Sequence, residues 1–535
     1  MRDLVIARFG RTPASGVEKN DPDRLQIPDS EVPRSLFQAL ARCVGERRVS
    51  TDRMDRIRHA VGQSYLDLIK LRRGELETVP DVVVYPGSHD EVVHVLAVCA
   101  KEEATVIPFG GGTSVVGGVN TRPGKHPTVV LDMARMNRLI AVDTVSLTAT
   151  LGAGMRGPEV AATLLPHGLT LGHLPQSFEF STVGGWVATR SAGQASTGFG
   201  RADQLVRGLR CATPIGELQL GRGPWSAAGP RLLDLIVGSE GAFGVITEVT
   251  FEVYPLPERQ RYEAWSFPSF AQGITALRML MRELGPGMAP DVCRLSDPDE
   301  TAITLALSRN TWATRVARAY LNLRGHGSSC VAILGWEGSV HQIIWRHRHA
   351  MALLRRHGAV PLGSGPARSW QRQRFVAPAL RDTLLDHGLL VETVETAAYW
   401  SDLPRVYEAV REAVLAELRP WRPLVLAHLS HLYRTGASLY FTILARRDDD
   451  DPIGQWTRAK HAVSQAIAEQ GATITHHHGI GSDHAPWMEA EVGQVGVTAL
   501  RALKAAVDPD RLLNPGVLIP DEADDGQQTT GETED

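Results

Sequence analysis

A run of glycines close to residue 110 constrains the fold more than any other feature of this sequence. The segment reads Pro108-Phe109-Gly110-Gly111-Gly112-Thr113-Ser114-Val115-Val116-Gly117-Gly118 and follows a stretch typical of a β-strand. Consecutive glycines allow a sharp turn that gathers several backbone N–H groups into a nest for phosphate oxygens. No lysine follows as in a Walker loop, and the GxGxxG spacing of a dinucleotide-binding turn is missing. Taken alone, the segment is equally compatible with an ordinary tight turn.

Three later segments of the chain are also composed largely of small residues. Residues 168–173, 175–193 and 238–248 are rich in glycine, serine and threonine. Small residues with free N–H groups and hydroxyls suit a long ligand whose pyrophosphate and ring system are both approached closely by the backbone. Together with the first loop, these segments predict a binding site for such a ligand.

Length, charge and cysteine content narrow the class of protein. The chain has 535 residues, more than one hydrophobic core usually organises, so we expect two or more domains. A formal net charge of −4 argues against a nucleic-acid partner. No apolar run approaches the length of a membrane span and no signal peptide opens the chain, which favours the cytoplasm and leaves peripheral membrane contact open. Five scattered cysteines indicate reduced thiols, and we expect neither disulfides nor a bound metal.

Changes in pattern divide the chain into four regions. Residues 1–75 read as an N-terminal helical extension, residues 76–257 as an α+β domain, residues 258–520 as a second domain, and residues 521–535 as a polar, disordered tail. In the first domain we expect a helix over residues 92–101 and strands over residues 104–108, 128–132 and 146–151. In the second we expect longer helices with strands over residues 330–336 and 438–444.

The ordered set of glycine-rich segments resembles the PCMH-type FAD-binding domain of the vanillyl-alcohol oxidase superfamily, over residues 76–257. The resemblance implies FAD, and glycines in the first loop, where some relatives carry a flavin-linked histidine, favour non-covalent binding. It also implies a cap domain with a mixed or antiparallel sheet and flanking helices. The cofactor-contacting positions that it implies are Pro108, Phe109, Gly110, Gly111, Gly112, Thr113, Ser114, Gln176, Ser177, Ser181, Thr182, Thr189, Arg190, Ser191, Ala192, Glu240, Gly241, Gly244, Val245 and Ile246.

Within that superfamily the chain resembles the alkyldihydroxyacetonephosphate synthase family, flavoenzymes of ether-lipid synthesis, from about residue 76 to residue 520. The segments that carry the resemblance are residues 177–186, 380–382, 392–400, 435–441 and 476–479. The family's functional residues then correspond to a catalytic tyrosine, a substrate-binding arginine, an arginine near the flavin and an essential histidine triplet: Tyr440, Arg381, Arg294, and His476, His477 and His478.

These residue types suit the reaction that the resemblance implies, in which flavin N5 forms an adduct with the substrate carbon, a fatty acid leaves and a fatty alcohol enters. Arg381 can bind a phosphate dianion as a planar fork, and the histidines can donate further hydrogen bonds and switch charge near neutral pH. Tyr440 can act as a base if neighbouring cations lower its pKa from about 10. We therefore expect a phosphorylated lipid-like substrate.

Each functional residue also has a structural interpretation. Arg381 with Asp382 could form a solvated surface pair, Tyr440 could be a core aromatic, and Arg294 could cap a strand edge. His428 and His431 suggest a metal pair, but their three-residue spacing on an expected strand places them on opposite faces, so structural roles are favoured.

A rival function is that of an FAD-dependent 2-hydroxy-acid dehydrogenase of the D-lactate or glycolate type. Such enzymes usually carry Glu-His-Gly-Ile-Gly where this chain has His477-His478-Gly479-Ile480-Gly481, so a carboxylate able to help hold a divalent metal is replaced. A cation-rich triplet suits a phosphate better than a metal-chelated hydroxy acid. No peroxisomal tripeptide ends the chain, and a homodimer is common among the relatives that the chain resembles.

Overall fold

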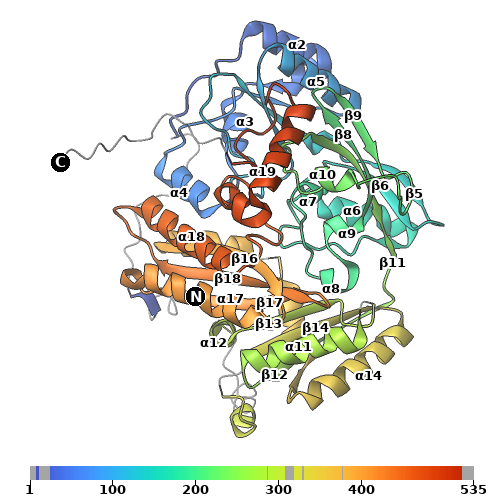
Figure 1. Ribbon diagram of the computed structural model, residues 1–535, viewed down its shortest axis with the longest axis vertical. Helices are drawn as coiled ribbons and strands as arrows, with labels where there is room; N and C mark the ends of the chain where they lie inside the picture. Colours follow the sequence, from blue (N-terminus) through green and yellow to red (C-terminus); the bar gives the residue numbers. More distant parts are fainter. Residues whose placement is uncertain are drawn as a thin grey trace.

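The structure is a computed structural model that describes residues 8–10, 25–285, 287–307, 319–327, 330–375 and 377–520. The expected tail at residues 521–535 and most of the first 24 residues lie outside the described part. The described chain forms an N-terminal body (residues 25–255), a cap body (residues 259–469) and a return segment (residues 470–520) that packs back on the N-terminal body (Figure 1).

The N-terminal body begins with a four-stranded sheet in the order β1-β2-β4-β3. Strands β2, β4 and β3 are parallel, and β1 pairs antiparallel with β2, so the first 75 residues supply an edge strand as well as helices. The predicted strands and helix of this region are present within a few residues. The bounds are β1 (Val49–Ser50), β2 (Val82–Val84), β3 (Thr105–Phe109), β4 (Thr128–Asp132), α2 (Arg34–Val44), α3 (Arg53–Arg58), α4 (Tyr65–Arg73) and α5 (His89–Lys101).

A second, antiparallel sheet completes this body in the order β5-β6-β10-β8-β9. The central strand β10 buries nearly every other side chain along its second half, as expected for a strand with one face in a core. Short helices and the glycine-rich segments connect its strands. The bounds are β5 (Leu139–Asp143), β6 (Thr148–Gly152), β8 (Val206–Thr213), β9 (Gly216–Leu220), β10 (Val245–Glu252), α6 (Gly157–Leu164), α7 (Val183–Ala188), α8 (Ser196–Phe199), α9 (Ala202–Leu205) and α10 (Leu233–Ile236).

The cap body is built on a seven-stranded sheet in the order β15-β12-β14-β13-β17-β18-β16, and every pairing in it is antiparallel. Helices α11, α14, α17 and α18 flank it (Figure 1). The bounds are β12 (Arg259–Phe267), β13 (Val292–Ser296), β14 (Cys330–Gly338), β15 (Val360–Gly363), β16 (Leu389–Tyr399), β17 (Leu424–Leu432), β18 (Gly436–Arg446), α11 (Phe270–Leu284), α12 (Pro298–Leu307), α14 (Val340–Arg356), α15 (Ser364–Gln373), α16 (Ala377–Asp386), α17 (Leu403–Glu417) and α18 (Pro452–Glu469).

The return segment joins the two bodies. Thr473 forms a bridge with Ala397 at the end of β16, and α19 (Met488–Val507) then carries the chain back to the N-terminal body, where it is drawn in red in Figure 1. Leu513 pairs in parallel with Val106 of β3, and the backbone N–H of Asn514 donates to the Val106 carbonyl. None of the described helices is long and apolar enough to cross a membrane.

Candidate active site

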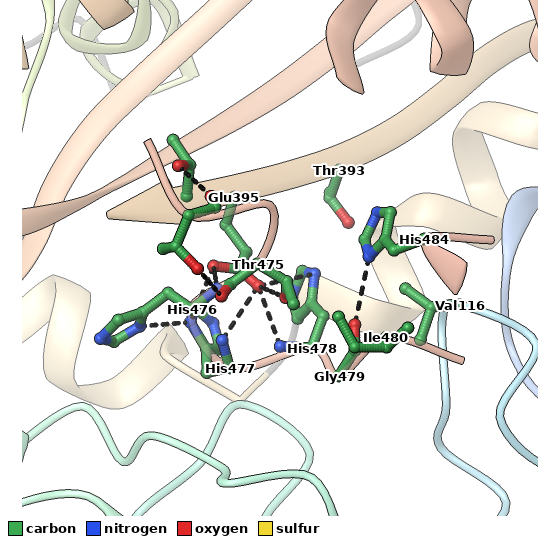
Figure 2. A network of polar contacts seen from close by, with 12 residues as sticks. Val116, Thr393, Glu395, Thr475, His476, His477, His478, Gly479, Ile480 and His484 are labelled. Atoms are coloured by element: carbon green, nitrogen blue, oxygen red, sulfur yellow. Dashed lines mark hydrogen bonds and ion pairs between the residues drawn. The ribbon is translucent and has the colours of Figure 1, made fainter. Parts of the chain in front are cut away.

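The three consecutive histidines lie at the start of the return segment, where the cap sheet meets the N-terminal body. Their backbone is held by Glu395, a buried residue near the end of β16. Its carboxylate accepts the backbone N–H groups of His476, His477 and His478 at 2.7, 3.0 and 2.9 Å, and the Thr475 hydroxyl at 2.6 Å (Figure 2). The amide nest of the triplet is therefore filled by an internal carboxylate, so only the imidazole rings can meet an anionic ligand.

A second buried carboxylate holds the next part of the same loop. Glu240 of the N-terminal body accepts the backbone N–H groups of Ile480 and Gly481 at 2.6 and 2.9 Å. Its carbonyl oxygen accepts from the Asn514 side chain at 2.6 Å. We expected Glu240 to contact the cofactor, but both its side-chain and main-chain oxygens bind the return segment.

The imidazoles form one cluster with two residues of the cap sheet. The Nδ1 atoms of His476 and His477 lie 3.0 Å apart, and the Tyr433 hydroxyl lies 2.6 Å from Nε2 of His476. His431 stacks on His476 with ring centroids 5.2 Å apart. The Tyr440 ring lies 6.2 Å from the His477 ring, centroid to centroid. The structure thus brings the predicted tyrosine and triplet together and adds two residues that sequence reasoning did not select, His431 and Tyr433.

The histidines of this cluster are neutral at neutral pH. Burial lowers the pKa of His477 to about 4, and it also lowers the pKa of His476, His478 and His431. The negative charge of Glu395 opposes this shift but does not cancel it. The expectation of a cation-rich triplet that switches charge near neutral pH is therefore wrong for the protein without substrate, because desolvation disfavours the imidazolium form.

Tyr440 lies on β18, opposite His428 on one side and Glu395 on the other. Burial raises the pKa of Tyr440 to about 12, and the Glu395 carboxylate adds to that effect. Arg294 acts in the opposite direction without offsetting it. The condition for Tyr440 to act as a base, a pKa lowered by neighbouring cations, is not met, because the phenolate would be both desolvated and close to a carboxylate. Tyr440 is therefore an un-ionised phenol at neutral pH.

Arg294 takes part in a partly buried ion network and does not cap a strand edge. From β13, its guanidinium donates to Glu300 at 2.7 Å and lies 3.0 Å from Nε2 of His428. Nδ1 of His428 lies 3.2 Å from the same Glu300 oxygen. Although burial opposes ionisation of Glu300, the two basic neighbours lower its pKa to about 2. The carboxylate thus orients both Arg294 and His428 beside Tyr440.

His428 and His431 both face the triplet, contrary to the expectation that they lie on opposite faces of a strand. The pairing of β17 with β18 shifts register between Ser430 and Leu432, which leaves His431 as the extra residue of a β-bulge with φ of 50°. A bulge re-aims the side chain that it carries. Nδ1 of His431 lies 2.6 Å from the Ser196 hydroxyl, so α8 of the N-terminal body also holds this ring.

Arg381 lies on α16 of the cap, away from the amide nest of the triplet. Its guanidinium donates to the carbonyl oxygen of Gln63 at 2.6 Å, and the carboxylates of Asp382 and Glu392 interact with it electrostatically. Its pKa is lowered by burial, and Tyr440 is among the groups that interact with it electrostatically. Its role in substrate binding stays a prediction, and the positive charge near Tyr440 is compatible with it.

The glycine-rich segments of the N-terminal body lie against one another as a cofactor site requires. A Cβ at Gly111 would overlap the carbonyl of Phe180, and a Cβ at Gly110 would overlap the Thr182 hydroxyl, so the loop after β3 packs directly on residues 180–182. The side of the loop that does not touch that segment is partly exposed. A partly exposed loop of glycines, whose backbone N–H groups are not covered by side chains, is suited to bind a pyrophosphate.

Two residues of the glycine-rich segments have buried polar atoms without a hydrogen-bond partner in the described part of the chain. Both ring nitrogens of His173, which is 3% exposed, lack a hydrogen-bond partner among the described residues, as does the hydroxyl of Ser239. Buried polar groups are almost always paired, so these atoms fit a bound cofactor. The guanidinium of Arg190, by contrast, donates to the carbonyl oxygens of Val237 and Asp234, so its side chain is directed at α10.

A metal-binding arrangement of imidazoles is also present. One ring nitrogen from each of His431, His476 and His477 lies within 4.8 Å of the others. Ser196, Tyr433 and the contact between two of the rings already occupy ring nitrogens of this group. We therefore interpret the cluster as a hydrogen-bonded network, and the expectation of no bound metal stays a prediction.

Removal of divalent metal ions with EDTA is expected to leave the flavin absorbance and the midpoint of thermal unfolding unchanged. A metal that held three buried imidazoles would stabilise the native state by mass action, and its loss would lower that midpoint. Elemental analysis before and after chelation provides the check. Stoichiometric zinc that leaves with a drop in thermal stability would show that the histidines are metal ligands.

Both the N-terminal body and the cap body match models of known protein families. The model for FAD binding domains matches residues 80–220, and that for the C-terminal domain of FAD linked oxidases matches residues 256–518. The alkyldihydroxyacetonephosphate synthase of Dictyostelium discoideum is 32% identical over 522 residues, which cover 95% of this chain and 84% of the relative. This chain belongs to the alkyldihydroxyacetonephosphate synthase family.

Other members of the alkyldihydroxyacetonephosphate synthase family agree with this assignment. The synthase of Trypanosoma brucei brucei is 32% identical over 540 residues, which cover 97% of this chain and 86% of the relative. A solved alkyldihydroxyacetonephosphate synthase structure superimposes with a TM-score of 0.81 at 28% identity and covers 96% of this chain and 92% of that one. The predicted α+β fold with a cap domain and the predicted family are confirmed. The chain is a flavoenzyme with FAD as its cofactor.

Proposed function

We propose that this protein exchanges the acyl chain of an acyl-dihydroxyacetone phosphate for a fatty alcohol. The observation that carries the proposal is the buried histidine triplet, held by Glu395 and placed beside Tyr440 and Arg294 in a chain with an FAD domain. The relatives named as alkyldihydroxyacetonephosphate synthases support the same substrate class.

Different residues of the site bind the phosphate and transfer the proton. Arg381 supplies a guanidinium for the phosphate, and the imidazoles of the triplet add neutral N–H donors. Tyr440 exchanges a proton with the substrate as an un-ionised phenol, and the neutral imidazoles beside it take that proton up.

The bond changes balance without net oxidation. The ester C–O bond breaks and the fatty acid leaves with the proton of the alcohol, while an ether C–O bond forms. FAD, when bound, would supply an electron-accepting ring to the exchange.

An exchange assay distinguishes this function from its rival. Purified protein is incubated with acyl-dihydroxyacetone phosphate and an isotopically labelled fatty alcohol, and mass spectrometry follows the label into the ether product. A 2-hydroxy-acid dehydrogenase would instead be bleached by D-lactate or glycolate without oxygen. The dehydrogenase has less support, since Glu395, the carboxylate at the triplet, is saturated by backbone donors and is not free to ligate a metal. Bleaching without label transfer would reverse this conclusion.

Binding of the phosphorylated substrate is expected to strengthen as the pH falls from about 8 to 6. Free His477 has a pKa of about 4, and a bound phosphate dianion raises the pKa of the imidazoles that it touches. The complex therefore binds more protons than the free protein, so lowering the pH favours it. Calorimetry with dihydroxyacetone phosphate in buffers of different ionisation enthalpy measures the proton uptake. Proton release or no proton exchange would show that the triplet gains no proton in the complex, so that its imidazoles remain neutral N–H donors.

The binding mode of the flavin, the oligomeric state and the location of the protein are part of the same proposal. We propose non-covalent FAD, a homodimer, a cytoplasmic location and peripheral contact with a membrane that supplies the lipid. Acid precipitation should release the yellow flavin into the supernatant, whereas covalent flavin would stay with the pellet.

A further inference from the structure

Two buried carboxylates bind the loop that carries the histidine triplet. Glu395 of the cap accepts three consecutive backbone N–H groups, those of residues 476, 477 and 478. Glu240 of the N-terminal body accepts those of residues 480 and 481. Gly479, between the two sets, has a φ of 90°. Five of six successive backbone N–H groups thus end on one of two side chains that come from different bodies of the protein.

We propose that Glu395 and Glu240 are positioning residues that together hold loop 476–481 and thereby fix the imidazoles against Tyr440. Neither residue needs to contact the substrate in this role. Together they join the histidine loop to both bodies, so the geometry of the site depends on how the cap and the N-terminal body are held relative to each other.

Charge and geometry both strengthen the contacts of Glu395, whereas burial raises the pKa of Glu240 to about 7, so Glu240 holds the loop mainly by geometry. Hydrogen bonds to an ionised carboxylate are shorter and about twice as strong as those between neutral groups. Although burial opposes ionisation of Glu395, its pKa is lowered well below the usual value, first by the three imidazoles and then by the Thr475 hydroxyl. Glu395 therefore holds the triplet as a carboxylate at neutral pH.

Glu240, the residue that holds the second part of the loop, has an unusual backbone conformation. Glu240 has a φ of 50°, which a non-glycine residue adopts only when its surroundings enforce it. Asn514 supplies such a contact through the Glu240 carbonyl oxygen. At Gly481 a Cβ would overlap the Val116 carbonyl, so the loop also packs tightly against the glycine-rich segment after β3. These constraints leave the loop one arrangement.

Hydrogen–deuterium exchange tests the holding role directly and does not depend on the proposed function. In the FAD-loaded full chain, Glu395→Gln is expected to speed amide exchange in the peptide covering residues 474–481 by at least tenfold, because local opening becomes easier. Glu240→Gln should act on the same peptide. Glu337→Gln is the matched control: Glu337 is a buried carboxylate in the same sheet that binds the Tyr262 hydroxyl, and it should leave this peptide unchanged.

The kinetic part of the test rests on the proposed exchange reaction. A positioning role predicts that Glu395→Gln lowers kcat by about 100-fold, the cost of misplacing catalytic groups by about an ångström, with little change in KM for the alcohol. Glu395→Asp should not restore kcat, since the shorter side chain keeps the charge but cannot reach three amides. Full activity of either variant with unchanged exchange would overturn the proposal.

A milder variant covers the case in which Glu395→Gln does not fold. Thr475→Val removes only the hydroxyl bond to Glu395 and keeps the carboxylate and its three amide bonds. Faster amide exchange in the same peptide would support the proposal, whereas unchanged exchange would overturn it. If exchange rises as expected and no variant or wild-type protein transfers a fatty alcohol, the holding role stands and the proposed reaction fails.

Discussion

Replacing Tyr440 by phenylalanine is expected to abolish acyl-for-alcohol exchange while FAD stays bound. The change removes one hydroxyl from a ring that lies 4.8 Å from His428 and 6.2 Å from His477, centroid to centroid, and keeps the packing of β18. Loss of a positioned proton-transfer group typically costs 10²–10⁴ in rate, and we expect a fall of about 10³ here. The labelled-alcohol assay measures the rate, and flavin absorbance measures bound FAD.

A second tyrosine of the cap provides a control that distinguishes a loss of proton transfer from a loss of stability. Tyr407 is buried in the cap, where its hydroxyl donates to Asp297, so Tyr407→Phe removes a tyrosine hydroxyl outside the triplet cluster. We expect that variant to keep most of its activity. A Tyr440→Phe protein that exchanges at the wild-type rate would remove the tyrosine from the mechanism and leave the imidazoles as the proton-transfer groups.

Replacing Gly111 by alanine is expected to yield protein with little or no FAD. A Cβ at this position would overlap the carbonyl of Phe180 and lie 3.0 Å from Cα of Ser181, both backbone atoms that cannot swing away. Overpacking of this kind typically costs about 1–3 kcal/mol, or roughly a tenfold to hundredfold loss in affinity if the displaced segment holds the cofactor. The ratio of flavin to protein absorbance and FAD titration of the apoprotein measure the effect.

Gly124→Ala is the control for this prediction. A Cβ at Gly124 meets nothing within 4 Å, and the residue lies in the loop before β4. Its FAD content should equal that of the wild type. If Gly111→Ala retained FAD with unchanged affinity, the loop after β3 would not be the pyrophosphate-binding loop, and the cofactor assignment would have to move to another glycine-rich segment.

The cofactor could be predicted from the sequence because the segments that resemble an FAD-binding domain are contiguous stretches of the chain. Glycine runs that let a backbone approach a ligand must be local, since the N–H groups of one nest come from successive residues. The strands and the helix that flank the first loop were expected from hydrophobic patterning and are present at β3, β4 and α5. The predicted family is likewise confirmed.

The electrostatics of the histidine site could not be predicted in the same way. The expected charge on the triplet is wrong, and the lowered pKa on which a basic Tyr440 would depend is not found, because burial depends on which distant segments cover a group. Glu395 stood in one of the quoted motifs, yet nothing local distinguished it from Glu392, which instead binds Trp456. His431 faces the cluster only because of a β-bulge, which the spacing of two histidines does not reveal.

The sequence by itself therefore determined the family, the cofactor and the residue types of the site, because each is encoded in short motifs whose atoms are neighbours along the chain. Only the tertiary structure decided how those residues are held and in which protonation state. The glycine loop after β3, the strand that carries Glu395 and the loop that carries the histidines lie hundreds of residues apart in places, and they meet only when the return segment folds back on the N-terminal body. Desolvation and hydrogen-bond partners, which set the pKa values and geometry, arise at that junction.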